Sequence, residues 1–596
     1  MPARRLRDHR NVSPVPGPVR RQDGMSPQFP PVPRALPIAL AIYLALWVAA
    51  GIAPSNWLWG LDQISCLPMA ASLALLGLAG AGFVPLLRGG MGGILDRVGE
   101  AARSRPALAD VLTGMTVGAI VFALRDPVHF VGDSGLRVGM LATRYPAAQL
   151  FPQAYPLDVL VNAHLARALT GFGLTGEQSL DVLGALMAAL YAAIGLAFVR
   201  EAGGRGRMIP VCALILLGGG AMIALPGYDK FGPLMVGTAL AALGALRLSR
   251  SAGGAWSLAA GTAVAVLSHR TGYLIVPAAA LAFLQAFRAA KNPSLRGNLV
   301  AAAVVTGLVS AALLPRTMQL LLRFDLATHV FAPAPSGMPA GGPGNLLLRL
   351  SDVVNLLFFM TPLWVVGATA GLFLLRSRKA DGVVRTSLAP VAALALAAQL
   401  VVALATRGQQ GPARDWDMHS GLGVILGLVT CHLLIRAARV ADLRSLWVPL
   451  GTGALAITIS LWSVFANEPA QLRRIEGQLR GRPSWDVAAR ARALDFLGLR
   501  AFNLGRFEEA ANEFERAVEV APNPRYFYQA GLARWRAGQP AAARELAIES
   551  ARRAPRNADP WWVLAAVARA AGDSSRMAAC LDSARVRGST GPPPGL

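Results

Sequence analysis

The sequence predicts an all-α protein, in which a polytopic helical membrane domain of about 13 spans precedes a soluble domain of helical repeats. Of its 596 residues, 54% are hydrophobic and 15% are charged, whereas soluble domains are about 45–50% apolar and about 25% charged. The apolar residues gather in runs of about 20, the length that a helix needs to cross a bilayer. After residue 466 these runs end and a helical pattern with a longer period begins.

Together the apolar runs define a membrane domain over residues 35–465. They lie near residues 36–53, 66–87, 107–124, 179–199, 209–225, 232–248, 255–268, 271–287, 298–314, 353–375, 387–405, 418–435 and 446–465. The sequence SHRTG interrupts the region 255–287, and the first of the two runs there is short.

The loops between these runs alternate in charge. One set is rich in arginine, for example RGGMGGILDRVGEAARSR and REAGGRGR, and the other set is poor in charge. Because cytoplasmic loops carry the excess of Lys and Arg, we expect the first set to be cytoplasmic, together with a disordered Pro- and Arg-rich tail over residues 1–34. An odd number of spans leaves the C-terminus external, and the composition indicates a bacterial cytoplasmic (inner) membrane with periplasmic repeats. The net charge of +24 then reflects topology, since no nucleic-acid-binding motif accompanies it.

Several ionisable residues fall at span ends on the predicted external side. Ionisable groups that gather at one face of a membrane bundle indicate a shared polar cavity. The alternative is that outer loops are simply wet and carry polar residues. The residues concerned are Asp133, Asp229, Lys230, His269, Arg270, Asp415 and Asp417.

The C-terminal region repeats itself. Gly505, Gly538 and Gly572 recur at intervals of 33 and 34 residues, and Pro522 and Pro555 recur 33 apart, which is the tetratricopeptide period. We therefore expect a linker over 466–484 and tetratricopeptide-like repeats over 485–590. Such stacks usually bind a protein partner, although the repeats could instead only cap the membrane domain.

The external loop over residues 125–178 carries the motifs GDSG at 132–135 and FPQAYPLDVL at 151–160. The amphipathic segment LDVLVNAHLARAL follows and suits an interfacial helix, and it leads into LGALMAALYAA. On these features the chain resembles membrane glycosyltransferases of the GT-C type, and within them the bacterial protein O-mannosyltransferase-like (DUF2723-like) family with a tetratricopeptide tail. It departs from that family at Leu136 and Arg137, where relatives carry an acidic residue soon after Asp-Ser-Gly.

The resemblance implies a catalytic aspartate at Asp133 and a polyprenyl-phosphate sugar donor. Transfer needs a base for the acceptor proton and cations for the departing phosphate, for which the arginine fork is suited. One carboxylate suffices for an inverting displacement, by analogy with inverting glycosidases. The candidate phosphate-binding residues are Arg270 and Arg414, followed by Lys230, His269 and Arg137.

The candidate substrate-binding residues are Tyr155, Asp229, Asp415, Trp416 and Asp417. Trp416 could stack on a sugar face or belong to an aromatic belt, while Asp415 and Asp417 could line the site or cap a helix. Asp229 could likewise cap the following helix. No metal motif can be read from the spacing, but some relatives of this fold hold a divalent cation with carboxylates, and Asp133 with Asp415 or Asp417 could do the same. The acceptor could be a protein, a lipid or a glycan.

Two other functions are compatible with the sequence. An O-antigen ligase or polymerase would need cations from the 315–352 loop, namely Arg316, Arg323, His329 and Arg349. A non-enzymatic scaffold would recruit envelope partners through the repeats. A transporter is disfavoured, because transporters interrupt their helices near mid-membrane, whereas here the polar residues gather at one face.

Overall fold

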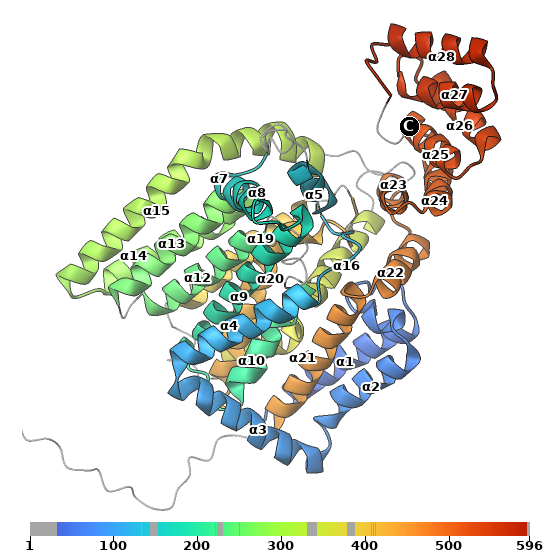
Figure 1. Cartoon of the computed structure of the whole chain (residues 1–596). Helices are drawn as coiled ribbons and strands as arrows, with labels where there is room; N and C mark the ends of the chain where they lie inside the picture. The colour runs from blue at the N-terminus through green and yellow to red at the C-terminus, as the bar shows by residue number, and fades with distance from the viewer. Residues whose placement is uncertain are drawn as a thin grey trace, which may run out of the picture.

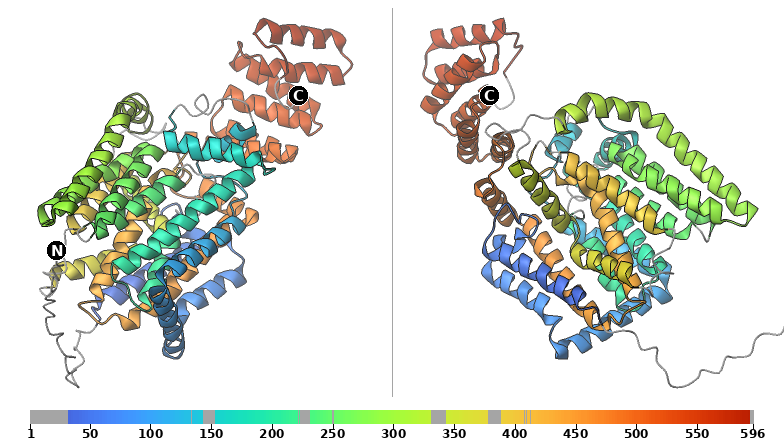
Figure 2. Two further views of the ribbon diagram at one scale, coloured as in Figure 1. Left: turned by 60° about the vertical axis from the view of Figure 1, so that its left-hand side comes forward. Right: turned by 180° about the vertical axis from the view of Figure 1, so that it is seen from behind.

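The computed structural model describes residues 32–132, 134–142, 153–220, 222, 231–248, 251–330, 343–377, 388–406, 408, 410–411 and 413–592. Throughout these segments the chain forms helices joined by loops, and they contain no β-strand. The helices form a membrane-type bundle, and a smaller stack of helices projects from one end of it (Figures 1 and 2). The all-α expectation is confirmed.

Seven helical segments of the described chain are long and apolar enough to cross a membrane. They are α1 (Ala35–Ile52), α4 (Pro106–Ala123), α9 (Gly176–Glu201), η4 with α14 (Arg270–Ala289), α15 with the start of η5 (Pro293–Leu326), η7 with α20 (Trp416–Ala437) and α21 (Arg444–Phe465). Two bent pairs raise the number to nine if each counts as one span. The expectation of about 13 spans is therefore not supported.

The two bent pairs show a limit of hydropathy alone. Helices α2 (Met69–Ala81) and α3 (Pro85–Ser104) meet at 82°, and α16 (Pro343–Met360) meets α17 (Trp364–Arg376) at 98°. At the second bend Leu363 has a φ of 61°, a left-handed conformation that ends a helix. Hydropathy depends on composition and not on the direction of the chain, so it predicts one straight span across each bend.

Four other predicted spans fold into helices of 10–17 apolar residues. They are α10 (Met208–Leu217), α12 (Gly232–Arg247), α13 (Ala252–Ser268) and α19 (Leu388–Ala405). At 1.5 Å per residue, 17 residues reach only about 25 Å, short of the roughly 30 Å hydrocarbon core. Helices α12 and α13 pack closely, since a Cβ atom added to Gly261 would lie 2.3 Å from the backbone nitrogen of Ala241. Helices α12 and α13 fill the interior of the bundle, since most of their residues are buried, whereas Val401 and Leu404 of α19 are exposed.

The two sets of loops gather at opposite ends of the bundle. At the end beside α3, Arg207 pairs with Asp96, and Arg439 donates to the carbonyl of Ala202 at 2.8 Å. At the other end lie α5 (Ser134–Ala142), α7 (Pro156–Val159) and α8 (Ala166–Thr170), near the base of the projecting stack (Figure 1). The predicted alternation of loops thus appears as two distinct ends, and the assignment of the arginine-rich end to the cytoplasm stays a prediction.

Helical structure covers the segment where the interfacial helix is expected. Helix α7, the π-helical η2 (Leu160–Leu165) and α8 follow one another without a gap over residues 156–170. Leu160 and Leu165 are exposed on this segment, as suits a helix that contacts the lipid boundary.

The projecting stack consists of three helical hairpins preceded by α22 (Glu468–Arg480). Its helices are α23 (Val487–Asn503), α24 (Phe507–Val520), α25 (Pro524–Arg536), α26 (Pro540–Arg553), α27 (Asp559–Ala570) and α28 (Ser574–Val586). Gly505, Gly538 and Gly572 have φ angles of 74°, 76° and 71°, so each occupies the left-handed position that turns one helix into the next. The segment predicted as a linker contains α22.

Candidate functional site

A cavity of about 550 Å³ opens at the end of the bundle that carries α5, α7 and α8, and it is called the polar cavity because acidic and basic side chains line part of it. Its walls come from the loop after α4 at Gly132, called the outer loop after its predicted side of the membrane, and from η4, η5 (Leu321–Val330) and the end of α19. Gln410, Asp415, Asp417 and Met418 complete the walls. The acidic, basic and histidine residues among its lining are His269, Arg270, Asp325, Asp415 and Asp417. Four of these five were predicted, and the fold brings them together from segments almost 150 residues apart in sequence.

The conformation and surroundings of Gly132, the first residue of the GDSG motif, require a glycine. Its φ is 59°, and a Cβ atom added here would lie 2.3 Å from Oδ2 of Asp417. The outer loop therefore passes directly over the Asp417 carboxylate, an approach that only glycine permits. Asp133, Asp229 and Lys230 lie outside the described residues. Gly132, which directly precedes Asp133 in the chain, lines the cavity.

His269 and Arg270 form one wall of the cavity. The His269 ring caps η4 (Arg270–Ile275), with Nδ1 2.8 Å from Oγ1 of Thr271, and it packs edge-on against Phe231. Nε of Arg270 lies 2.7 Å from Oδ2 of Asp325. The cation predicted to bind phosphate is thus paired with a carboxylate in the described structure.

Asp325 was not predicted as a site residue. It lies in η5, a π-helix, and is 8% exposed. In the sequence, Asp325 is the single acidic residue of the stretch LLRFDLATHV. Its position in a π-helix is a second indication, because π-helical turns are frequent at functional sites. Its pairing with Arg270 joins segments 55 residues apart, which no local pattern reveals.

The DWD segment divides between the cavity and the core. Asp417 lines the cavity and is 5% exposed. Asp415 also lines it, while its Oδ2 accepts a hydrogen bond from the backbone nitrogen of Gln410 at 2.6 Å. The Trp416 indole is 1% exposed and packs edge-on against Phe359. Neither suggested role of Trp416 fits this position, because the buried ring presents no face to a sugar or to a membrane interface.

Two other candidates support the walls rather than line the cavity. Arg137 forms a bidentate pair with Asp158, with bonds of 2.8 and 3.1 Å, which ties α5 to α7 in a fully buried position. Tyr155 is buried, and its hydroxyl lies 2.7 Å from Oγ1 of Thr317. Burial raises the pKa of Tyr155, and the bond to Thr317 opposes this shift. The expected direct contacts of Arg137 with phosphate and of Tyr155 with substrate do not fit these positions.

Arg414 also faces another part of the molecule. Its Nε donates to the carbonyl of Phe130 at 2.8 Å, and its guanidinium lies 4.9 Å from the ring centre of Phe130 and 4.6 Å from that of Phe496. Phe496 belongs to α23, the first helix of the stack. Arg414 therefore joins the outer loop to the repeats, a role that its sequence position beside DWD did not suggest.

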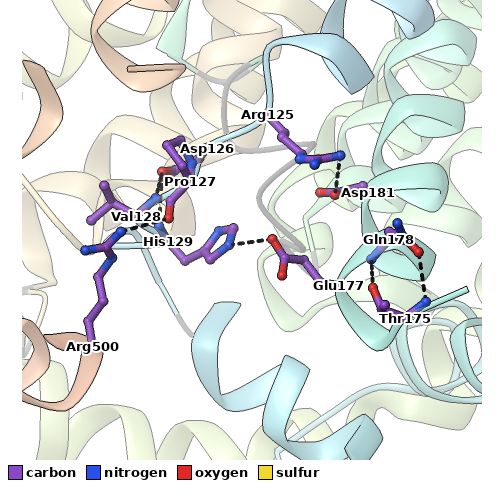
Figure 3. Close-up of polar contacts among 10 residues, drawn as sticks. All are labelled: Arg125, Asp126, Pro127, Val128, His129, Thr175, Glu177, Gln178, Asp181 and Arg500. Atoms are coloured by element: carbon purple, nitrogen blue, oxygen red, sulfur yellow. Dashed lines mark hydrogen bonds and ion pairs between the residues drawn. The ribbon is translucent and has the colours of Figure 1, made fainter. Parts of the chain in front are cut away.

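The outer loop before Gly132 is held by a further set of polar contacts (Figure 3). His129 Nε2 lies 3.3 Å from Glu177 Oε1, and Arg125 lies 3.7 Å from Asp181 in the first turns of α9. Arg500 of α23 donates to the carbonyl of Pro127 at 3.4 Å. Glu177 and Asp181 were not predicted, although Asp181 interrupts the apolar stretch SLDVLGAL.

A second, apolar cavity of about 420 Å³ lies along the same helices. The polar cavity is lined by Leu274 and by Val402 of α19, and the apolar one by Ile275 and by α19 residues 389–396. It continues beside α20 toward Arg436. The bundle thus places an apolar space next to the polar cavity.

Two of the three arginines required by the ligase-type alternative bond to backbone carbonyls. Arg316 donates to the carbonyl of Ala154 at 2.9 Å, and Arg349 donates to the carbonyls of Leu404 and Thr406. These bonds hold neighbouring loops together. The side chain of His329 lies outside the described residues.

Within the described segments, no group of three His, Cys, Asp or Glu residues could hold a metal ion. Asp415 and Asp417 share the cavity, but one oxygen of Asp415 already accepts the Gln410 bond. The divalent cation stays an untested prediction.

Comparison with known families identifies a tetratricopeptide repeat over residues 491–524. This segment spans α23 and α24, so the predicted tetratricopeptide character is confirmed for the first hairpin. A search of curated proteins gives no match to the chain.

Proposed function

We propose that this chain is an integral membrane glycosyltransferase that moves a sugar from a polyprenyl-phosphate donor to an acceptor on the external face. The proposal rests above all on the polar cavity, where the GDSG glycine, the His269–Arg270 pair and the two carboxylates of DWD meet at one end of a membrane bundle. Ionisable groups at such a position in a membrane protein mark a functional site.

In the proposed reaction Asp133 is the general base. It takes the proton of the acceptor hydroxyl as that oxygen attacks the anomeric carbon, and the bond from that carbon to the phosphate oxygen breaks. The electron pair leaves with polyprenyl phosphate, and the configuration inverts. Asp417, which meets the outer loop at Gly132, and Asp415 would bind sugar hydroxyls, with Asp229 as a further candidate.

The departing phosphate would meet Arg270 and His269, with Lys230 as a further candidate. Because Arg270 is paired with Asp325, the phosphate would have to share or displace that carboxylate. Arginine has five N–H donors, so a guanidinium bonded to Asp325 through Nε keeps donors for a second anion.

The apolar cavity supports a lipid-linked donor over a soluble one. An isoprenoid chain lying there would place its phosphate toward Arg270, because α19 lines both cavities and the neighbouring residues Leu274 and Ile275 line one each. Burial of apolar surface contributes roughly 25 cal/mol per Å². The repeats would then hold a protein partner or the acceptor beside the same end of the bundle.

The test is the variant Asp133→Asn in vesicles supplied with polyprenyl-phosphate mannose and a serine- and threonine-containing peptide. We expect release of polyprenyl phosphate to fall at least a thousandfold while membrane insertion and abundance stay normal. Asp442→Asn, at the arginine-rich end, is the matched control and should retain activity. Normal turnover by Asp133→Asn would refute the proposal. A scaffold would instead tolerate this change and lose its function when residues 485–596 are removed.

A further inference from the structure

We infer that the first repeat helix α23 positions the catalytic loop through a clamp in which Arg414, Phe130 and Phe496 all contact one another. This inference rests on the proposed function. It assigns the repeats a direct part in the transfer site, beyond partner binding, and it makes Phe496 a positioning residue.

The clamp is built from three segments far apart in the chain. The Arg414 guanidinium carbon lies 4.9 Å from the ring centre of Phe130 and 4.6 Å from that of Phe496. The two rings meet edge-on at 5.4 Å. Phe130 and Arg414 are 3% and 8% exposed, and shielding from water strengthens a cation–π contact.

Hydrogen bonds to backbone carbonyls also connect these three segments. The Gly132 nitrogen donates to the carbonyl of Arg414 at 3.2 Å, and Nε of Arg414 donates to the carbonyl of Phe130. Nη1 of Arg414 lies 3.4 Å from the carbonyl of Arg492 in α23. Helix α23 of the repeats is therefore connected through Arg414 to the loop that carries the GDSG motif.

The position of the clamp in the chain gives it a chemical consequence. Phe130 lies three residues before Asp133, and Arg414 directly precedes Asp415 and Asp417. The clamp thus fixes the separation of the two carboxylate-bearing segments. A displacement of about 1 Å at a reacting group can lower a rate about a hundredfold, so a contact outside the cavity can control turnover.

The test compares Phe496→Leu, which keeps an apolar side chain but removes the π face, with Phe496→Tyr, which keeps that face. The matched control is Phe507→Leu, because Phe507 of α24 likewise packs against an arginine, with Arg536 of α25 4.5 Å from its ring centre. Turnover is followed with polyprenyl-phosphate mannose and the same peptide. Hydrogen exchange of residues 125–142 is measured on each full-length variant.

We expect Phe496→Leu to lower kcat about tenfold, with KM for the donor changed less than twofold, and to accelerate exchange of residues 125–142. Phe496→Tyr and Phe507→Leu should match the unmodified protein in both measurements. Unchanged exchange in Phe496→Leu, or an equal loss of kcat in Phe507→Leu, would overturn the inference. If Asp133→Asn keeps full turnover, the proposed function fails, whereas the exchange measurement still decides whether the clamp exists.

Discussion

Ion pairs at the two ends of the bundle differ in their exposure to water. At the arginine-rich end, the side chains of the Arg207–Asp96 pair are 25% and 42% exposed, and those of Arg247–Glu201 are 40% and 21% exposed. At the cavity end, the side chains of Arg137–Asp158 are 4% and 3% exposed, and those of Arg270–Asp325 are 16% and 12% exposed. Exposed pairs contribute little to stability, whereas a buried pair is costly to break. Of these four pairs, the two at the cavity end are the better shielded from water.

Removal of one partner of the most buried pair should have the largest effect. Arg137→Ala leaves the Asp158 carboxylate buried and uncompensated, so we expect a loss of about 3–5 kcal/mol in the free energy of unfolding. Thermal unfolding in detergent measures this loss. The double variant Arg137→Met with Asp158→Leu should recover most of it, and a double variant as unstable as the single one would contradict the explanation.

The next effect should come from Gly132→Ala. The added methyl group meets the Asp417 carboxylate, and the left-handed φ costs a non-glycine residue roughly 1–2 kcal/mol. We expect turnover to fall at least tenfold, with little change in the unfolding midpoint. Gly135→Ala is the matched control, since a Cβ atom there meets nothing within 4 Å. Equal turnover of the two variants would show that the loop does not need its approach to Asp417.

A smaller effect is expected from Asp325→Asn. The loss of the carboxylate frees the Arg270 guanidinium for the donor phosphate, so KM for the donor should fall about threefold to tenfold. Arg270→Gln should raise the same KM. Donor titrations at constant peptide measure both, and an unchanged KM in both variants would place the phosphate elsewhere.

The smallest effect should follow Arg207→Ala at the opposite end. Its partner Asp96 is accessible to water, so we expect less than about 1 kcal/mol of destabilisation and unchanged turnover. The same thermal and donor assays apply. A loss comparable to that of Arg137→Ala would remove the distinction between the two ends.

The repeats were predictable to within a few residues because their signals are local. Gly505, Gly538 and Gly572 mark turns that need a positive φ, and each turn follows from the residues beside it. The spans were less predictable. Hydropathy identified apolar segments correctly, but it could not detect the bend at Leu363 or the short, interior character of α12 and α13.

The candidate site was predictable where topology alone decides it. His269, Arg270, Asp415 and Asp417 follow or precede spans on one side, and they meet in one cavity. Roles that depend on long-range packing were missed. Trp416 is buried by Phe359, and Arg414 turns toward Phe496, and neither contact leaves a trace in the neighbouring sequence.

The side-chain amide of Asn56 connects the end of the first helix to the segment before the repeats. Nδ2 of Asn56, just after α1, donates to the carbonyls of Gln478 at 2.9 Å and Pro483 at 2.8 Å. The end of the first helix therefore touches the segment that leads into the repeats. The 18 residues of α1 reach about 27 Å, so its start lies nearly a bilayer core away from that contact. If α1 crosses the membrane, a single traversal separates Ala35 from the repeats, however many helices in between also cross.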